Sequence, residues 1–304
     1  MGRITTRFGF QSTASEVVEG IDLSGKKVVV TGGASGIGIE TSRAFASIGA
    51  EVTLAVRNTG AAANVVADIV SSTGNARVRA LRLDLADRDS IARFCDAWEG
   101  PLHVLVNNAG IMAVPELQKT DEGWEMQFAT NYLGHFALAS GLHPALASAG
   151  NARIVSLSSS GHLFSPMIFD DPHFDFVPYD PIVAYGQSKT AAALFAVAAT
   201  RNWATDGIMA NAVMPGAIAT NLQRHTGGLR TPVERRKTPQ QGAATTLLVA
   251  SSPDLEGIGG RYFEDCTEAV PVDRRVPDPT GVAPYAIDPA NADRLWAMTR
   301  TLLA

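Results

Sequence analysis

Short apolar runs rich in β-branched residues alternate with longer helical patterns from residue 26 onward. The runs cover residues 28–30, 52–56, 78–83, 104–106, 154–157 and 208–213. Strands that are apolar on both faces are typical of parallel sheets covered by helices on both sides. Because connections between parallel strands are right-handed, the pattern predicts a single doubly wound parallel-sheet domain with three layers, α/β/α. Such sheets bind ligands outside the carboxyl ends of their strands.

The first run leads into a glycine-rich turn, Thr31-Gly-Gly-Ala-Ser-Gly-Ile-Gly38, followed by a helical pattern. The glycines permit a sharp turn and a close approach of the backbone to a ligand. The helix would direct its free N–H groups and its positive dipole end at this turn, which favours a pyrophosphate. Glycine turns also occur without a ligand, and the spacing is not G-x-G-x-x-G. The turn alone therefore leaves a dinucleotide site and a structural turn both open.

Composition narrows the class of protein. The 304 residues are 46% hydrophobic and 18% charged, enough for a sizeable core, and the net charge of -5 argues against a nucleic-acid partner. The N-terminus has no apolar signal segment, and the longest apolar run, residues 191–199, is too short to span a bilayer. The two cysteines, Cys95 and Cys266, fit a reducing compartment. We expect a cytoplasmic protein that has no membrane partner.

We expect three segments along the chain: an N-terminal arm with a short helix at 1–24, the sheet domain at 25–265 with a loop insertion at 161–182, and a C-terminal extension at 266–304. Residues 1–12 look like a loose arm, and Thr13-Ala-Ser-Glu16 matches a helix capping box. The irregular stretch 165–180 is longer than a usual connection, and long ordered loops are often functional. After the Pro-rich stretch 267–285, Asp288-Pro289 opens a helix whose apolar face must dock on its own domain or on a second subunit.

Polar residues follow two of the predicted strands, as Asn107-Asn-Ala-Gly110 and Ser158-Ser-Ser-Gly161, although each is also compatible with a plain turn. Tyr185 and Lys189 have the i, i+4 spacing that places two side chains on one helix face. A phenol pKa of about 10 must fall by about three units, roughly 4 kcal/mol, for acid–base work near neutral pH. An ammonium about 4 Å away contributes about that much at an effective dielectric of about 20. A lone Tyr-x-x-x-Lys is also compatible with an ordinary surface pair.

Together with Asn131 and Pro215-Gly216, these motifs resemble the ordered motif set of the short-chain dehydrogenase/reductase family, over roughly residues 13–265. The stretches Glu19–Lys26, Val56–Asn58 and Ala184–Ala191 resemble the branch of retinol dehydrogenases and WW-domain oxidoreductases. We expect neither the WW domains nor the membrane anchor of that branch. The resemblance implies a Rossmann fold and a nicotinamide-dependent oxidoreductase.

The resemblance also implies the catalytic residues. Tyr185 would donate or accept the proton, Ser159 would bind the substrate oxygen, and Lys189 would hold the ribose and lower the phenol pKa. Asn131 would anchor a water that leads from Lys189 to solvent, and its alternative is a structural amide. Counting from Ile154-Val155 places the family's serine on the second of the three consecutive serines, which is Ser159.

The cofactor contacts that the resemblance implies are Gly32, Ser35, Gly36, Ile37, Gly38, Arg57, Asn58, Asp84, Leu85, Asn108, Ala109, Gly110, Tyr185, Lys189, Pro215, Gly216, Ile218 and Thr220. Asp84 resembles the adenine contact and Thr220 the hydroxyl that meets the nicotinamide amide, but both could equally be helix caps. Where NAD enzymes place an acid on the ribose, this chain has Val56 and then Arg57, whose guanidinium suits a 2′-phosphate. We therefore expect NADP(H) to be preferred and NAD(H) to be possible, unless Arg57 points into solvent.

The sequence thus predicts hydride transfer between NADP(H) and a small-molecule alcohol, ketone or aldehyde. A lipophilic substrate is expected because the stretches 165–180 and 222–237, which we expect to cover it, contain Phe169, Phe174, Phe176 and Leu229. Two alternatives remain: an epimerase or dehydratase that retains NAD, and a non-catalytic regulator that senses a dinucleotide.

Two further expectations concern metals and assembly. Asp170, Asp171, His173 and Asp175 resemble a ligand cluster only loosely, so no metal is expected. The Ala-rich helix beginning at Tyr185 could pack closely on a neighbour, which favours a homodimer or homotetramer.

Overall fold

The computed structural model describes residues 2–276 and 279–304, so Met1 of the expected arm and residues 277–278 of the Pro-rich stretch lie outside the described residues. Within them, eight strands form one sheet in the order β10-β9-β6-β5-β4-β1-β2-β3. The strands are β1 (Lys27–Thr31), β2 (Glu51–Val56), β3 (Val78–Arg82), β4 (Val104–Asn107), β5 (Ala152–Leu157), β6 (Ile208–Met214), β9 (Tyr262–Glu264) and β10 (Thr267–Glu268). Neighbouring strands are parallel except for β9 and β10. The predicted doubly wound sheet is confirmed, since each of the six apolar runs falls on one of the strands β1 to β6.

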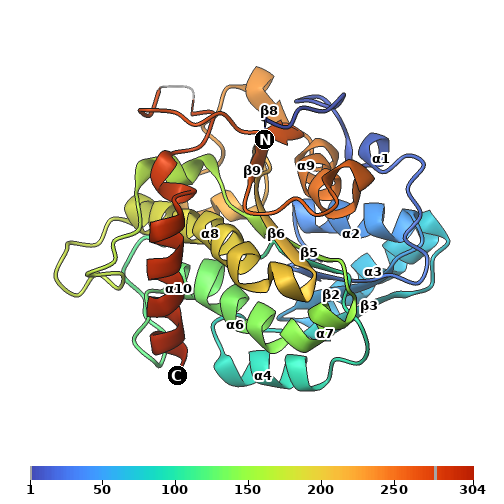
Figure 1. Ribbon diagram of the computed structural model, residues 1–304, viewed down its shortest axis with the longest axis horizontal. Helices are drawn as coiled ribbons and strands as arrows, with labels where there is room; N and C mark the ends of the chain where they lie inside the picture. Colours follow the sequence, from blue (N-terminus) through green and yellow to red (C-terminus); the bar gives the residue numbers. More distant parts are fainter. Residues whose placement is uncertain (1, 277–278) are drawn as a thin grey trace.

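Helices cover both faces of this sheet, which gives the expected three layers (Figure 1). One face carries α1 (Ala14–Val17), α2 (Ile37–Ser47), α3 (Thr59–Thr73) and α9 (Pro239–Ser251). The other carries α4 (Arg88–Asp96), α5 (Met126–Phe128), α6 (Gly134–Gly141), α7 (His143–Ser148), α8 (Pro181–Trp203) and α10 (Pro289–Leu303). Successive side chains of a strand point to opposite faces, so Val29 packs in one core while Val28 and Val30 pack in the other.

The order of the strands fixes where a ligand can bind. The chain runs outward from β1 to β3, returns to β4 beside β1, and then runs outward in the other direction to β6 and β9. The direction therefore reverses between β1 and β4, and the crevice outside their carboxyl ends is the expected ligand site of a doubly wound sheet. The predicted motif residues lie at this end of the sheet.

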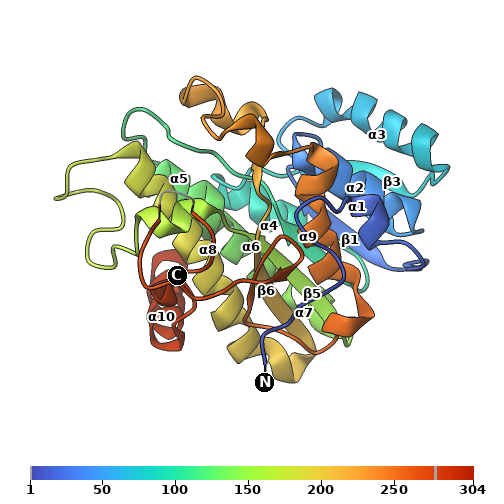
Figure 2. The ribbon, with the colours of Figure 1, turned by 90° about the horizontal axis from the view of Figure 1, so that it is seen from above.

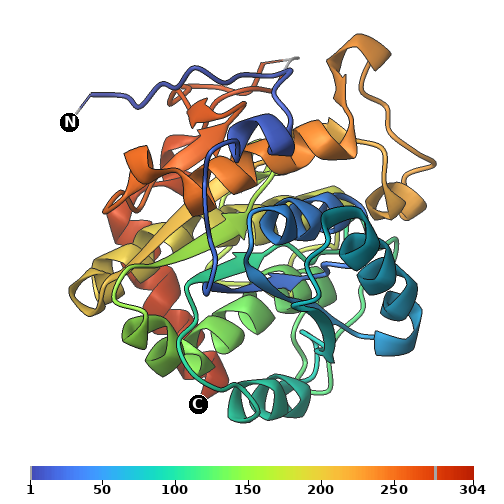
Figure 3. The same cartoon turned by 90° about the vertical axis from the view of Figure 1, so that its right-hand side faces the viewer.

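The N-terminal arm is not loose, contrary to the sequence-based expectation. Arg3 and Ile4 exchange hydrogen bonds with Glu268, and the Thr6 hydroxyl donates to the Cys266 carbonyl at 2.8 Å. Figure 3 shows the arm running along the segment that follows β9. The arm forms hydrogen bonds with backbone groups at the edge of β10. Because these groups lie more than 250 residues later in the chain, no local sequence pattern could predict the contact. The predicted capping box at Thr13 and Glu16 is present at α1.

The structure corrects the start of the Ala-rich helix. α8 begins at Pro181, with the Asp180 carboxylate accepting from the N–H groups of Ile182 and Val183, so Tyr185 lies in its second turn. Residues 181–182, assigned above to the loop insertion, therefore belong to α8. Every residue of α8 from Ala184 to Ala199 is buried within the single chain. These residues therefore cannot pack on a neighbouring subunit as expected, and the homodimer or homotetramer itself stays a prediction.

The C-terminal helix α10 covers this face of α8 in the same chain (Figure 1). Its Trp296 packs against Phe136, Phe195 and Trp203, with ring centroids 4.7 to 6.5 Å apart. The Thr299 hydroxyl lies 2.6 Å from the buried hydroxyl of Tyr132. Among the described residues, no helix is both long and apolar enough to cross a membrane.

Candidate active site

The crevice between β1 and β4 is closed at its base by Thr31, the last residue of β1. The Thr31 hydroxyl accepts hydrogen bonds from the N–H groups of Asn108 and Ala109, both at 2.9 Å. The Asn108 side chain donates back to the Thr31 carbonyl at 2.7 Å. These bonds hold the turn after β4 against the glycine turn, so the motif residues from two distant stretches meet here.

The glycine turn is packed so tightly that its Gly36 and Gly38 have no room for a side chain. A Cβ added at Gly38 would lie 2.4 Å from the Gly32 carbonyl oxygen, and one at Gly36 would lie 3.1 Å from the Thr220 methyl group. Gly36 also has φ of +54°, which favours glycine. No side chain caps α2, whereas Asn58 caps α3 and Asp87 caps α4. A helix N-terminus without a side-chain cap, next to a glycine-rich turn, is suited to binding a dinucleotide pyrophosphate.

Tyr185 and Lys189 share one face of α8, as the spacing predicts. The Lys189 ammonium lies 5.6 Å from the centre of the Tyr185 ring and donates to the Leu157 carbonyl at 2.9 Å. Burial raises the pKa of Tyr185 to about 12 and lowers the pKa of Lys189 to about 8. The expected fall of the phenol pKa is therefore wrong for the protein alone, because burial disfavours the charged form of both groups.

The three consecutive serines after β5 have different environments. The Ser158 hydroxyl is buried and donates to the Lys189 carbonyl at 2.8 Å. The Ser159 hydroxyl accepts from the Gly161 N–H at 3.0 Å and caps the 3₁₀ turn η2 (Ser160–Phe164). A Cβ built on Gly161 would lie 2.7 Å from the Tyr185 ring and 3.4 Å from the Ser159 oxygen. The Ser159 hydroxyl and the Tyr185 ring therefore both lie beside Gly161.

Asn131 lies in the π-turn η1 (Ala129–Leu133) that precedes α6. Its amide exchanges two hydrogen bonds with the backbone of Ile111 and donates a third to the Ser188 hydroxyl, all at 2.9 Å. The amide therefore joins the turn after β4 to α8, which is the structural alternative considered for it. Its backbone carbonyl accepts from His135 at 3.0 Å.

Sequence reasoning missed His135, which lies four residues after Asn131. Its Nδ1 donates to the Asn131 carbonyl, so Nε2 of the neutral ring accepts from the Thr31 hydroxyl at 2.9 Å. Burial lowers the pKa of His135 to about 4, which keeps the ring neutral near pH 7. One histidine therefore links the glycine turn with Asn131. Its i, i+4 spacing from a motif residue was the available signal.

The other predicted cofactor residues line the same edge of the sheet. Arg57 follows β2 and is exposed, Asp84 and Leu85 follow β3, and Pro215 and Gly216 follow β6. Asp84 is not a helix cap, since Asp87 caps α4 and the Asp84 carboxylate accepts from Ala86 N–H.

Beyond Gly216, the chain enters a two-stranded sheet of β7 (Ala217–Ile218) and β8 (Arg236–Lys237), which contains Ile218. Thr220 forms a capping box with Gln223 at the start of the 3₁₀ turn η4 (Asn221–His225), so the capping alternative holds for Thr220.

The aromatic residues of segment 165–180 have three different environments. Phe174 is buried against Tyr179, the Phe169 ring lies under the Arg294 guanidinium, and Phe176 is 91% exposed. Figure 2 shows this segment and residues 219–237 projecting from the body of the molecule.

The acidic residues of the same segment serve its own fold. Asp171 accepts from the N–H groups of Asp175, Phe176 and Val177, and Lys119 pairs with Asp175. Among the described residues, no group of three or more His, Cys, Asp or Glu side chains could hold a metal.

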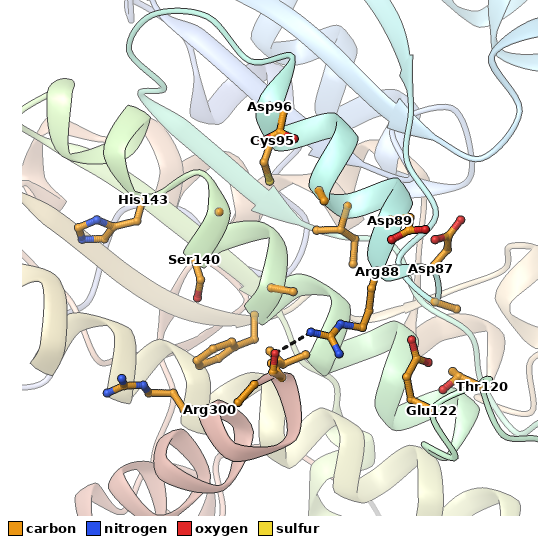
Figure 4. A pocket seen from close by; sticks show the side chains of 18 of the residues that line it. Asp87, Arg88, Asp89, Cys95, Asp96, Thr120, Glu122, Ser140, His143 and Arg300 are labelled. Carbon is orange, nitrogen blue, oxygen red and sulfur yellow. Dashed lines mark hydrogen bonds between the residues drawn. The ribbon is translucent and has the colours of Figure 1, made fainter.

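A large groove lies elsewhere, between α4, α6 and α10 (Figure 4). This groove of about 1460 Å³ is lined by Arg88, Ser140 and Arg300 among others, and Arg88 donates to the Leu303 carbonyl. None of the predicted site residues lines it. The groove therefore does not coincide with the predicted site.

Comparisons with known proteins agree with this architecture. A family model described as short chain dehydrogenase matches residues 26–228. A Streptomyces antibioticus protein named "Probable oxidoreductase" is 54% identical over 289 residues, which cover 91% of this chain and 97% of that protein. The human WW domain-containing oxidoreductase is 36% identical over 312 residues, covering 98% of this chain and 72% of the human protein.

A solved structure of an uncharacterized protein from Mycobacterium paratuberculosis superposes with a TM-score of 0.74 at 32% identity. The match covers 96% of this chain and 97% of that one.

Proposed function

The chain belongs to the short-chain dehydrogenase family, and we propose that it transfers a hydride between NADP(H) and a carbon that carries an alcohol or carbonyl oxygen. An oxidoreductase acting on such groups follows from the family and from relatives named as oxidoreductases. Members of the family use nicotinamide dinucleotides. One observation carries the finer proposal: the Ser159 side chain forms a hydrogen bond with that of Tyr185 after the end of β5, and the Lys189 ammonium lies 5.6 Å from the centre of the phenol ring.

In this proposal Tyr185 moves the proton. During reduction its hydroxyl donates to the substrate oxygen, and during oxidation it takes the proton back. Burial keeps the phenol protonated, with a pKa of about 12, so the acid form is ready for reduction. The Lys189 ammonium stabilises the phenolate that remains, since a pKa of about 8 leaves this group mostly charged near pH 7.

Ser159 binds the substrate oxygen in this proposal. Its oxygen already accepts from the Gly161 N–H, so its own proton is available for donation. A bound nicotinamide supplies the carbon that gives or takes the hydride and, when oxidised, a positive charge. The glycine turn and the open N-terminus of α2 would hold the pyrophosphate, while Arg57 would contact a 2′-phosphate.

A substitution series tests these roles. Purified protein is screened against ketones and aldehydes for NADPH consumption, and kcat is then measured on the best substrate. Tyr185→Phe should lower kcat by about 10²-fold or more, because general acid–base catalysis contributes about that much. NADPH affinity, measured by fluorescence titration, should stay within a few fold because the ring remains.

The serines provide matched controls for this series. Ser159→Ala should lower kcat far more than Ser158→Ala or Ser160→Ala. Substantial turnover by Tyr185→Phe, or equal effects at the three serines, would contradict the assignment. Cofactor that stays bound through dilution, with no net NADPH consumption, would instead favour an epimerase or dehydratase.

A lipophilic substrate is supported by apolar side chains on the two projecting segments, where Phe176 is 91% and Val233 73% exposed. A cytoplasmic location is supported by two free cysteines. A homodimer or homotetramer would need a surface other than the covered face of α8, and light scattering at micromolar concentration tests it.

A further inference from the structure

The turn that follows β5 carries Ser159 and touches Tyr185 at the same time. Ser159 caps η2, and Gly161 in this turn lies so close to the Tyr185 ring that a Cβ there would be 2.7 Å from the ring. The position of η2 therefore fixes Ser159 relative to the phenol. Whatever holds η2 in place also holds the distance between the two groups proposed to meet the substrate oxygen.

His162 holds this turn from inside. It is fully buried, and its Nε2 accepts from the backbone N–H of Ala283 at 3.1 Å. Because that nitrogen accepts, the single proton of the neutral ring lies on Nδ1, which donates to the Ser159 carbonyl at 2.6 Å. Burial lowers the pKa of His162 to about 4, so this neutral tautomer persists near pH 7.

Two tyrosines from the last part of the chain complete the contact. Tyr262 of β9 donates to the Ser159 carbonyl at 3.2 Å, and its ring lies 5.0 Å from the His162 ring. Tyr285, in the 3₁₀ turn η7 (Pro284–Ala286), donates to the His162 carbonyl at 2.7 Å. Ser159 is thus held, directly by Tyr262 and through His162 by Ala283 and Tyr285, and all three residues lie beyond the segment 26–228 that the family model matches.

We propose that His162 is a positioning residue: its Nδ1–H holds the Ser159 carbonyl in the orientation that the reaction needs, and the Ala283 N–H fixes the tautomer that carries this proton. This inference rests on the role proposed for Ser159. A neutral imidazole is suited to the task because it donates on the Ser159 side and accepts on the Ala283 side. A catalytic group displaced by about 1 Å can lose about 10²-fold in rate, so a loosened Ser159 should be visible in kcat.

Two substitutions separate the two sides of the ring. His162→Asn retains an N–H near the position of Nδ1, so the bond to the Ser159 carbonyl can persist. His162→Gln places an acceptor near the position of Nε2, so it can keep Ala283 while losing the donor to Ser159. We expect kcat to fall by about 10- to 100-fold in His162→Gln and by less than about 5-fold in His162→Asn.

The measurements distinguish positioning from a general loss of structure. The primary deuterium isotope effect on kcat should rise in His162→Gln, because hydride transfer slows, while NADPH affinity stays within twofold. His143→Gln is the matched control, since His143 is partly exposed and paired with Asp206 away from the motif residues. Tyr285→Phe, which retains the ring, should lower kcat several fold and provides a second test if His162→Gln fails to fold.

A readout independent of turnover is the tautomer itself. In ¹⁵N-histidine spectra, His162 should remain the neutral Nδ1–H form down to about pH 5, given its pKa of about 4. A neutral Nε2–H form would overturn the proposal, as would equal kcat values for the Gln and Asn variants. An unchanged isotope effect with equally lowered melting temperatures in both variants would also overturn it. An active Tyr185→Phe would refute the proposed function instead, whatever the His162 variants show.

Discussion

Val56 and Arg57 are the residues on which we base the proposed preference for NADP(H) over NAD(H). Val56 ends β2, and Arg57 lies exposed beyond it with no carboxylate at the position where one would contact the ribose. A planar guanidinium forms charge-assisted hydrogen bonds with a 2′-phosphate, typically about 1.5 to 3 kcal/mol. This corresponds to a preference for NADP(H) of roughly tenfold to 150-fold.

The double substitution Val56→Asp with Arg57→Ala should reverse this preference, because the new carboxylate repels the phosphate and bonds the free hydroxyl. The measurement is the ratio of kcat/KM for NADPH and NADH. Arg82→Ala, an exposed arginine at the end of β3, serves as the control. An unchanged ratio in the double variant would mean that Arg57 points into solvent.

Individual residues differed in how far the sequence could predict them. Ser159, Tyr185 and Lys189 carry recognisable motifs, and the structure places their side chains near one another. His135 and His162 lie outside these motifs, and each is connected to the site by a hydrogen bond to the backbone of a motif residue nearby in sequence. The expected fall of the phenol pKa is wrong for the protein alone. The i, i+4 spacing shows that a charged group lies nearby, but it does not show the burial that raises the pKa.

Among the elements, α10 is the one whose contribution is easiest to measure. Leu295 is 1% exposed in the core between α10 and α8. Leu295→Ala should lower the free energy of unfolding by about 2 to 5 kcal/mol, the usual range for a buried leucine. Urea denaturation measures it, and exposed Arg300→Ala should change it by less than about 0.5 kcal/mol. Equal small effects would indicate that α10 does not dock on its own chain.

Element boundaries were predicted less well than element types. The six apolar runs located β1 to β6, but β9 and β10 are only three and two residues long, too short for a periodic signal. The predicted start of α8, at Tyr185, is one turn too late. The true start is marked by Asp180-Pro181, an ordinary pair of helix cap and first helical residue.

For the whole molecule, the buried histidines predict sensitivity to acid. The pKa values of His135 and His162 lie near 4 in the folded state and near 6.5 in an unfolded chain. Between these values the unfolded state binds more protons, so the free energy of unfolding falls as the pH drops from 6.5 towards 4. Each histidine contributes a loss of up to about 2 kcal/mol between pH 6.5 and 5.

Urea unfolding at pH 7 and pH 5 measures this loss. Burial raises the pKa values of Glu125 and Glu264, so these two groups increase the free energy of unfolding as the pH falls. The loss caused by His162 is therefore isolated by comparing the protein with its His162→Asn variant. This variant lacks one imidazole and should lose less stability over the same interval. Parallel curves for the variant and the unsubstituted protein would contradict a neutral buried His162.

The pairing of the chain's two ends has a consequence for biosynthesis. Ribosomes deliver a chain from its N-terminus, and early parts begin to fold before late parts exist. Here the partner of Ile4 is Glu268, which is synthesised much later. The residues that hold Ser159, which are Tyr262 directly and Ala283 and Tyr285 through His162, are also synthesised late. A nascent or prematurely terminated chain could therefore complete the glycine turn and the strands around it while its serine remained unsupported. We therefore expect competence for turnover only after residues 262–285 have left the ribosome.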